Sequence, residues 1–147
     1  MGSGLEKVDV IYDTGSHWLA IDTDLCANCT ALDGTYFNTA SSTTFNILDS
    51  DTSTDGIQYN TLAQKYDNAN YTGYEATDRA AIDSAGTYKV SNMTFFAITD
   101  VSWKTEAVRY EDLASKAHLN KDYDGFLGLS RQFTPGSSVT NGPLWLN

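Results

Sequence analysis

The stretch Val10–Ser16 reads Val-Ile-Tyr-Asp-Thr-Gly-Ser, and it decides the predicted fold. The β-prone residues Val10–Tyr12 lead into an acidic residue, Asp13, and Gly15 follows two positions later. Glycine allows a sharp turn because it lacks the side chain that would clash there. We therefore expect a strand that ends in a tight loop, with the carboxylate of Asp13 on the inner side. Taken alone, Asp13-Thr14-Gly15 also fits an ordinary turn in which the aspartate caps backbone amides.

The chain outside this stretch predicts a mostly β structure. Ile57–Lys65 and Tyr74–Ile82 flank a polar tip, which is typical of a long hairpin. Tyr88–Val90 and Met93–Ile98 are expected as two further strands. Asp49–Gly56 is polar throughout and is expected to be a loop.

One segment, Glu106–His118, predicts a short helix because it lacks Gly and Pro and follows Thr105, a potential cap. Its apolar residues Val108, Leu113 and Ala117 fall only loosely on one face.

Composition bounds the function. The 147 residues fit one domain and carry 19 acidic against 9 basic side chains, a net charge of −10. A phosphate backbone repels such a surface, so the charge argues against nucleic-acid binding. No run of 18 apolar residues exists, so no membrane span is predicted. The acidic surface fits an acidic compartment, and it fits a simple solubility role equally well.

Three sequons, headed by Asn28, Asn70 and Asn92, could each accept a glycan in a secretory lumen. Cys26 and Cys29 are the only cysteines, and their spacing leaves three interpretations open. They could form a local disulfide, a redox Cys-x-x-Cys pair or half of a zinc site. A zinc site would need two more ligands, and the only histidines lie far apart in the sequence, so no metal is predicted.

Five features stand in the order in which the pepsin family of aspartic proteases carries them. They are the Val10–Ser16 motif, the small cysteine loop, an aromatic-Asn-x-x-x-Ser-Ser-Thr pattern at Tyr36–Phe45, a flap-like Tyr66–Gly73 and the Asp-Gly-Phe-Leu-Gly-Leu of Asp124–Leu129. The chain therefore resembles the N-terminal lobe of a pepsin-like aspartic protease over nearly its whole length. The resemblance implies that residues 1–147 form a single all-β, pepsin-type lobe of twisted, orthogonally packed sheets, with a flap hairpin and one short helix.

The resemblance also implies a role for each matched residue. Asp13 would be a catalytic carboxylate, Ser16 would orient it by a hydrogen bond, and Thr14 and Gly15 would support the loop. Cys26 and Cys29 would form the family's disulfide. The segment that crosses under the Asp loop and braces it would consist of Asp124, Gly125, Phe126, Leu127 and Gly128.

In the flap, Tyr66 would close over the substrate, and Asp67 and Asn68 would offer backbone groups to it. The tryptophan that commonly supports this tyrosine in the family aligns with Ala20, and neighbouring Trp18 is the expected substitute.

By resemblance, the function is that of an aspartic endopeptidase lobe that supplies one carboxylate of a water-activating dyad, without a cofactor. Its substrate would be a peptide or protein, and its compartment the secretory pathway, the lysosome or vacuole, or the extracellular space. The chain holds no second Asp-Thr-Gly or Asp-Ser-Gly, so a C-terminal lobe or second chain must bring the other aspartate. The alternative is a catalytically inactive lobe that serves as a binding or structural subunit of a larger assembly. A carbohydrate-binding β domain is a third interpretation, which rests only on the aromatic content.

Overall fold

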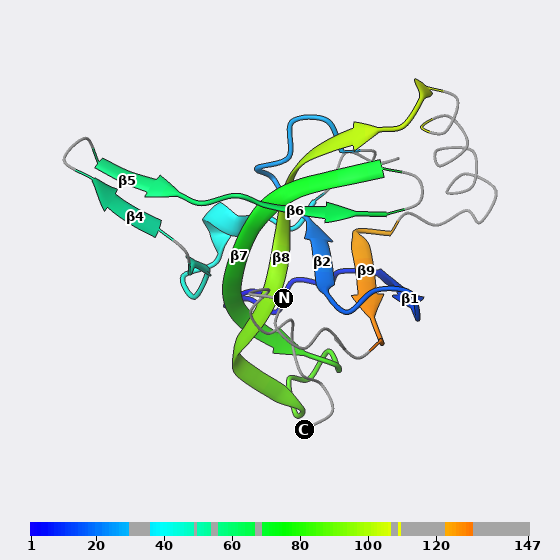
Figure 1. Cartoon of the computed structure of the whole chain (residues 1–147). Helices are drawn as coiled ribbons and strands as arrows, with labels where there is room; N and C mark the ends of the chain where they lie inside the picture. Colours follow the sequence, from blue (N-terminus) through cyan, green and yellow to red (C-terminus); the bar gives the residue numbers. More distant parts are fainter. Residues whose placement is uncertain are drawn as a thin grey trace.

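The computed structural model describes residues 1–29, 36–48, 50–53, 56–66, 69–106, 109 and 123–130. Strands dominate this part of the chain, and the prediction of an all-β lobe is confirmed (Figure 1). In chain order the elements are β1 Val10–Asp13, β2 Leu19–Asp22, the 3-10 helix η1 Thr39–Ser41, β3 Asn46–Ile47, β4 Ser50–Ser53, β5 Gly56–Tyr59, β6 Leu62–Lys65, β7 Ala69–Ala81, β8 Lys89–Trp103 and β9 Gly125–Gly128.

Seven strands form one mixed sheet in the order β1-β9-β2-β8-β7-β3, and β6 pairs with β7 as well. Strand β9 lies between the two earliest strands, parallel to β1 and antiparallel to β2. Its register sets Gly125 opposite Val10 and Gly128 opposite Asp13. The late Asp-Gly-Phe-Leu-Gly segment is therefore the direct neighbour of the strand that ends in the Asp loop.

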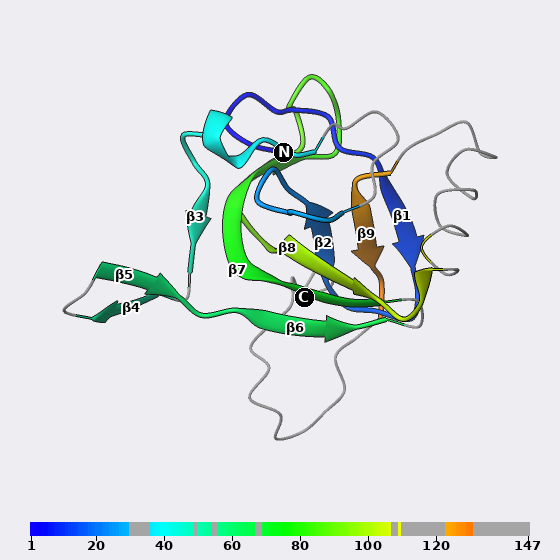
Figure 2. The same ribbon diagram turned by 90° about the horizontal axis from the view of Figure 1, so that it is seen from above.

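The two longest strands, β7 and β8, bend strongly, and the single sheet bends with them (Figures 1 and 2). The first part of β7 pairs with β6, and a later part pairs with β3. The register with β8 shifts between Thr72 and Gly73. A Cβ at Gly73 would lie 2.1 Å from the carbonyl oxygen of Ala97, so only glycine allows the two backbones to approach so closely.

Two apolar clusters pack against opposite faces of β8. Phe95 belongs to one cluster with Ile21 and Phe37, whereas its neighbour Phe96 belongs to the other with Trp18. Successive side chains of a strand point to opposite faces, so adjacent phenylalanines enter different clusters. The second cluster also includes the half-buried flap residue Tyr66 and the brace residue Phe126.

Three strand predictions need correction. Asp49–Gly56 is not all loop, because β4 pairs there with β5 in a two-stranded ribbon that projects from the sheet in Figures 1 and 2. Ile57–Tyr59 belongs to this ribbon, so the flap hairpin consists of β6 and a β7 that begins five residues before Tyr74. The two strands expected on either side of Ser91 are one continuous β8. Backbone pairing overrides the local polar pattern in β4, and β8 continues through Ser91 and Asn92 although neither residue has a partner in β7.

The predicted helix Glu106–His118 lies mostly outside the described residues. Glu106 and Arg109 are described and helical, and the amide of Arg109 donates to the carbonyl of Thr105 over 3.2 Å. Within the part of the chain that the structure covers, no helix has the length and apolarity to cross a membrane.

Candidate active site

Asp13 is the last residue of β1, and its loop is held through both its side chain and its backbone. The amide of Gly15 donates to Asp13 Oδ1 over 2.8 Å, and the carbonyl of Asp13 accepts from the amide of Leu129 over 2.7 Å. The Asp13 side chain is half-buried, whereas Thr14 and Gly15 are exposed at the tip. The loop therefore presents a fixed carboxylate that solvent or a ligand can reach.

Ser16 anchors the far side of the same loop. Its carbonyl accepts two hydrogen bonds from Ser130, one from the amide over 2.9 Å and one from the hydroxyl over 2.8 Å. Its own hydroxyl is buried, and it forms no full hydrogen bond with any described residue, Asp13 included. The Tyr66 phenol approaches it closely enough for Ser16 to lower the pKa of that phenol, although the geometry falls short of a full hydrogen bond.

The brace begins with Asp124, which is tied to strands on both sides. Its amide donates to the carbonyl of Asp9, and its Oδ2 accepts from the amide of Asp9, both over 2.6 Å. Its carbonyl accepts from the amide of Asp22, also over 2.6 Å. One residue therefore connects the strand preceding the Asp loop with the strand following it.

The two glycines of the brace are required by close backbone contact. A Cβ at Gly125 would lie 1.9 Å from the carbonyl oxygen of Ala20, and one at Gly128 would lie 2.6 Å from the amide nitrogen of Trp18. Between them, Phe126 and Leu127 alternate, so that Phe126 packs in the cluster of Trp18 and Leu127 in the other cluster. Glycine at both ends is what lets β9 fit between β1 and β2.

The flap residue Tyr66 rests on the brace. Its ring stacks on Phe126 with centroids 5.3 Å apart and an interplanar angle of 26°, and it meets Tyr71 edge-on at 5.2 Å. Its amide donates to the carbonyl of Ala69 over 2.9 Å, which closes the hairpin tip. The other predicted flap residues, Asp67 and Asn68, lie outside the described residues.

Tyr66 is also an electrostatic neighbour of the Asp loop. Burial is the largest cause that raises the pKa of its phenol above the ordinary 10.0, and the negative charge of Asp13 raises it further. The phenol therefore stays a neutral O–H donor at neutral and acidic pH.

His17 and Trp18 follow the Asp loop directly, and His17 is half-buried whereas Trp18 is buried. Burial lowers the pKa of His17 below 6.5, and its Nε2 has no hydrogen-bond partner in the described part of the chain. Trp18 is 1% exposed, and its ring is tilted by 51° against that of Phe96 with centroids 6.1 Å apart. The indole Nε1 of Trp18 likewise donates to no described group, so Trp18 shares a cluster with Tyr66 but does not hold its phenol.

Cys26 and Cys29 form a disulfide, as the resemblance implied. A zinc site would require free thiolates, which the bonded pair does not provide. The oxidised form of a redox Cys-x-x-Cys pair contains the same disulfide. Over the residues that the structure describes, no group of three or more His, Cys, Asp and Glu side chains is placed to hold a metal ion.

The disulfide loop also contains a clasp that the sequence did not reveal. The side-chain amide of Asn28 donates to the carbonyl of Val101 over 2.8 Å, and its Oδ1 accepts from the Val101 amide over 2.7 Å. Asn28 thus joins the cysteine loop to the end of β8, where it completes the backbone pairing of an edge residue.

The structure brings most of the described candidate residues together and leaves one group apart. Asp13, Ser16, Tyr66 and the brace from Asp124 to Gly128 form one connected site, whereas the disulfide lies in a separate loop packed on the Trp18 cluster. No model of a known protein family matches the chain, and no curated protein matches it either. The likeness to pepsin-like proteases therefore rests on the motifs quoted above.

Proposed function

We propose that this chain is a lobe of an aspartic endopeptidase and that Asp13 is its contribution to a catalytic pair of carboxylates. The observation that carries the proposal is the Asp loop itself. A strand ends in Asp13, the amide of Gly15 donates to its carboxylate, and the following brace holds the loop from behind. A flap tyrosine lies over the same loop, as a residue that covers bound substrate would.

The proposed chemistry needs a second carboxylate from a partner lobe or chain. Two carboxylates in close contact cannot both ionise, so the pair shares one proton. The ionised member takes a proton from a water molecule, which attacks the peptide carbonyl, and the protonated member gives its proton to the carbonyl oxygen. The tetrahedral intermediate then breaks its C–N bond, and the leaving nitrogen takes the proton that the first carboxylate accepted from water. In this scheme the Gly15 amide orients the carboxylate of Asp13, and the neutral Tyr66 phenol offers a hydrogen bond to the substrate.

The proposed substrate class follows from the way in which a hairpin can bind and cover a peptide. An extended peptide can bind by backbone hydrogen bonds beside a hairpin such as β6–β7, and closure of the hairpin excludes water from the reaction. Protein segments that are unfolded or already extended would be cut, and acidic pH would favour the singly protonated pair.

The second candidate, a lobe that binds or supports other subunits without catalysis, is favoured by one specific observation. The Tyr66 ring is already stacked on Phe126 with its phenol beside Ser16, so the described end of the flap rests on the loop of the single lobe. A flap that stays there would cover Asp13 and keep a substrate away from it.

Peptide hydrolysis between about pH 3 and pH 6, measured on the full-length product of the reading frame, tests the proposal. Pepstatin should inhibit the cleavage, and Asp13→Asn should reduce the rate by about 10²–10⁴-fold because it removes an acid–base group without changing shape. Glu6→Gln removes an exposed carboxylate outside the loop and should leave the rate unchanged. A folded full-length protein with no such activity would leave the non-catalytic function.

A further inference from the structure

Three asparagines begin the sequons of this chain, and the structure describes all three. They are Asn28 in the cysteine loop, Asn70 in β7 and Asn92 in β8. Each of them is exposed, so exposure alone does not tell them apart. The side-chain amide nitrogen does, because a glycan is joined to that atom.

The side-chain amide of Asn28 is held at both of its polar atoms. Its nitrogen donates to the Val101 carbonyl over 2.8 Å, and its oxygen accepts from the Val101 amide over 2.7 Å. The N–H and C=O of one strand residue point to the same side of the strand. Val101, which lies opposite Tyr71 of β7, therefore turns both groups toward Asn28 and away from β7. Asn28 takes the place of a further strand at this edge.

A glycan on Asn28 would displace this clasp. A glycosylated asparagine is a secondary amide, and such amides strongly prefer the trans form, in which the new substituent lies on the side of the amide's own oxygen. The Asn28 hydrogen that reaches the Val101 carbonyl is on that same side, because the oxygen of the same amide binds the Val101 N–H. The first sugar carbon would therefore replace the hydrogen that the clasp uses. Modification of Asn28 and the clasp exclude each other.

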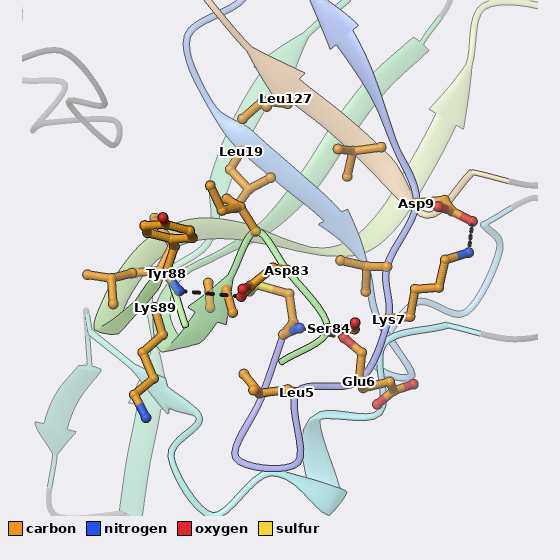
Figure 3. Close-up of a pocket in the computed structure, with 18 of the residues that line it drawn as sticks. Leu5, Glu6, Lys7, Asp9, Leu19, Asp83, Ser84, Tyr88, Lys89 and Leu127 are labelled. Atoms are coloured by element: carbon orange, nitrogen blue, oxygen red, sulfur yellow. Dashed lines mark hydrogen bonds and ion pairs between the residues drawn. The ribbon is translucent and has the colours of Figure 1, made fainter. Parts of the chain in front are cut away.

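The side chains of Asn70 and Asn92 are under no such restraint. Neither forms a hydrogen bond with any residue that the structure describes. Asn92 lines a groove of about 1260 Å³ beside the start of β8, so open space lies next to its amide (Figure 3). Thr94, which supplies the hydroxyl of the same sequon, lines this groove as well. The whole Asn92 sequon is therefore presented on an accessible face.

The Asn70 side chain lies on the outer face of the flap hairpin. Its neighbour Tyr71 is 4% exposed and meets Tyr66 and Phe126 edge-on. Successive side chains of a strand point to opposite faces, so the Asn70 side chain points away from these rings. A glycan on Asn70 would extend from the face opposite Tyr66 and would leave Asp13 accessible.

We propose that Asn70 and Asn92 are the glycosylation sites of this chain when it passes through a secretory lumen, and that Asn28 stays unmodified in every folded molecule. The Asn28 nitrogen serves the fold instead, as the donor of the clasp to Val101. A glycan added to Asn28 before folding would give a chain that cannot close the clasp, and such chains should be retained with misfolded protein. The proposal does not depend on the proposed protease function, because glycan positions and peptide hydrolysis are separate measurements.

The test is a map of the glycans on the full chain, secreted from a eukaryotic host behind an added signal peptide. Enzymatic removal of the glycans converts each modified asparagine to aspartate, and mass spectrometry of the peptides then identifies the positions. We expect Asn70 and Asn92 to be modified in the secreted, folded protein and Asn28 to be unmodified there.

Three threonine variants remove the sequons one at a time and keep the asparagines. Thr72→Ala and Thr94→Ala should each lose one glycan. Thr30→Ala is the matched control, because it removes the third sequon and keeps the Asn28 side chain, so the number of glycans should not change.

Hydrogen exchange tests the clasp as the cause without any substitution. In the unmodified chain from a bacterial host, the Asn28 side-chain hydrogen bound to Val101 should exchange with solvent more slowly than the side-chain amide hydrogens of Asn70 and Asn92. A glycan on Asn28 in secreted, folded protein, the absence of a glycan from Asn70 or from Asn92, or equal exchange at the three amides would each overturn the proposal.

Discussion

Strand β8 passes through two different environments within 15 residues. From Phe95 to Ile98 every side chain is 0% exposed, whereas from Lys89 to Asn92 every residue is exposed. The first stretch pairs with β7 along its whole length and with β2 from Phe96 to Ile98, whereas in the second only Lys89 and Val90 pair with β7 and no residue pairs with β2. Val90 is as apolar as many core residues, so composition does not explain the difference. Coverage by the neighbouring strand decides burial here, and that coverage depends on the brace that holds β2.

The largest effect should come from a change in β9, the brace that holds β2 beside the covered stretch of β8. Gly125→Ala would place a Cβ 1.9 Å from the carbonyl oxygen of Ala20, so β9 must move away from β2. We expect a loss of about 3 kcal/mol or more in the free energy of unfolding, or no folding at all, measured by chemical denaturation. Gly4→Ala is the matched control, because nothing lies within 4 Å of a Cβ there. Equal stability of the two variants would contradict the close packing of the brace.

A smaller effect is expected near the C-terminal end of β8, where Asn28 binds the backbone of Val101. Asn28→Ala removes both hydrogen bonds to Val101, a residue that is only 3% exposed. Two lost bonds to a poorly hydrated backbone should cost about 2 kcal/mol, measured by denaturation with the disulfide intact. Ala27→Ser changes an exposed neighbour in the same loop and should be nearly neutral. A neutral Asn28→Ala would mean that solvent replaces the clasp without loss.

His17 sharpens the comparison through pH. Its pKa is lowered by burial in the folded chain, so the unfolded chain binds the proton at higher pH. Its contribution to stability is therefore complete above about pH 6.5 and is lost as the pH falls through the lowered folded value. Between about pH 7 and pH 5, the melting temperature of His17→Gln should fall less than that of the unchanged chain. The difference should be modest because His17 is only half-buried. The carboxylates are common to both chains, so parallel curves would show that His17 does not contribute.

The smallest effect should come from Ile82, which follows the end of β7 and lies beside the exposed start of β8. Ile82 is 79% exposed, so Ile82→Thr should change the free energy of unfolding by no more than about 0.5 kcal/mol. The same substitution at Ile98, which is 0% exposed in the covered end, should cost about 2 kcal/mol because it buries a hydroxyl in an apolar cluster. Similar losses at the two positions would mean that exposure does not decide the effect of an isoleucine substitution in this part of the sheet.

The strand content and the Asp loop could be predicted from local sequence, because they depend on β-prone runs, a turn glycine and short-range geometry. The place of β9 between β1 and β2 could be expected only through the family motif, since no local pattern tells which distant strands will pair. The Asn28 clasp was missed for the same reason. Its partner, Val101, lies 73 positions along the chain, and the only local signal is an asparagine inside a tight cysteine loop.

The wrong expectations share one physical cause. Ser91 and Asn92 interrupt the apolar pattern, but both sit where no second strand covers β8, so polar side chains are tolerated without ending the strand. The polar stretch before Gly56 forms half of a ribbon because backbone hydrogen bonds need no apolar residues. Side-chain pattern reports burial, and these segments are strands with little to bury.

Gly73 lies seven positions after Tyr66 and fixes the point at which β7 touches the backbone of β8. Between the two, the buried Tyr71, 4% exposed, and the exposed Asn70 point to opposite faces of the flap. A single residue inserted between Asn70 and Gly73, or deleted there, would exchange these faces, because strand side chains alternate with a period of two. The aromatic side chain would then meet solvent and the sequon asparagine would meet Phe126. The number of residues between Asn70 and Gly73, more than their composition, decides which face of the hairpin is turned toward the Asp loop.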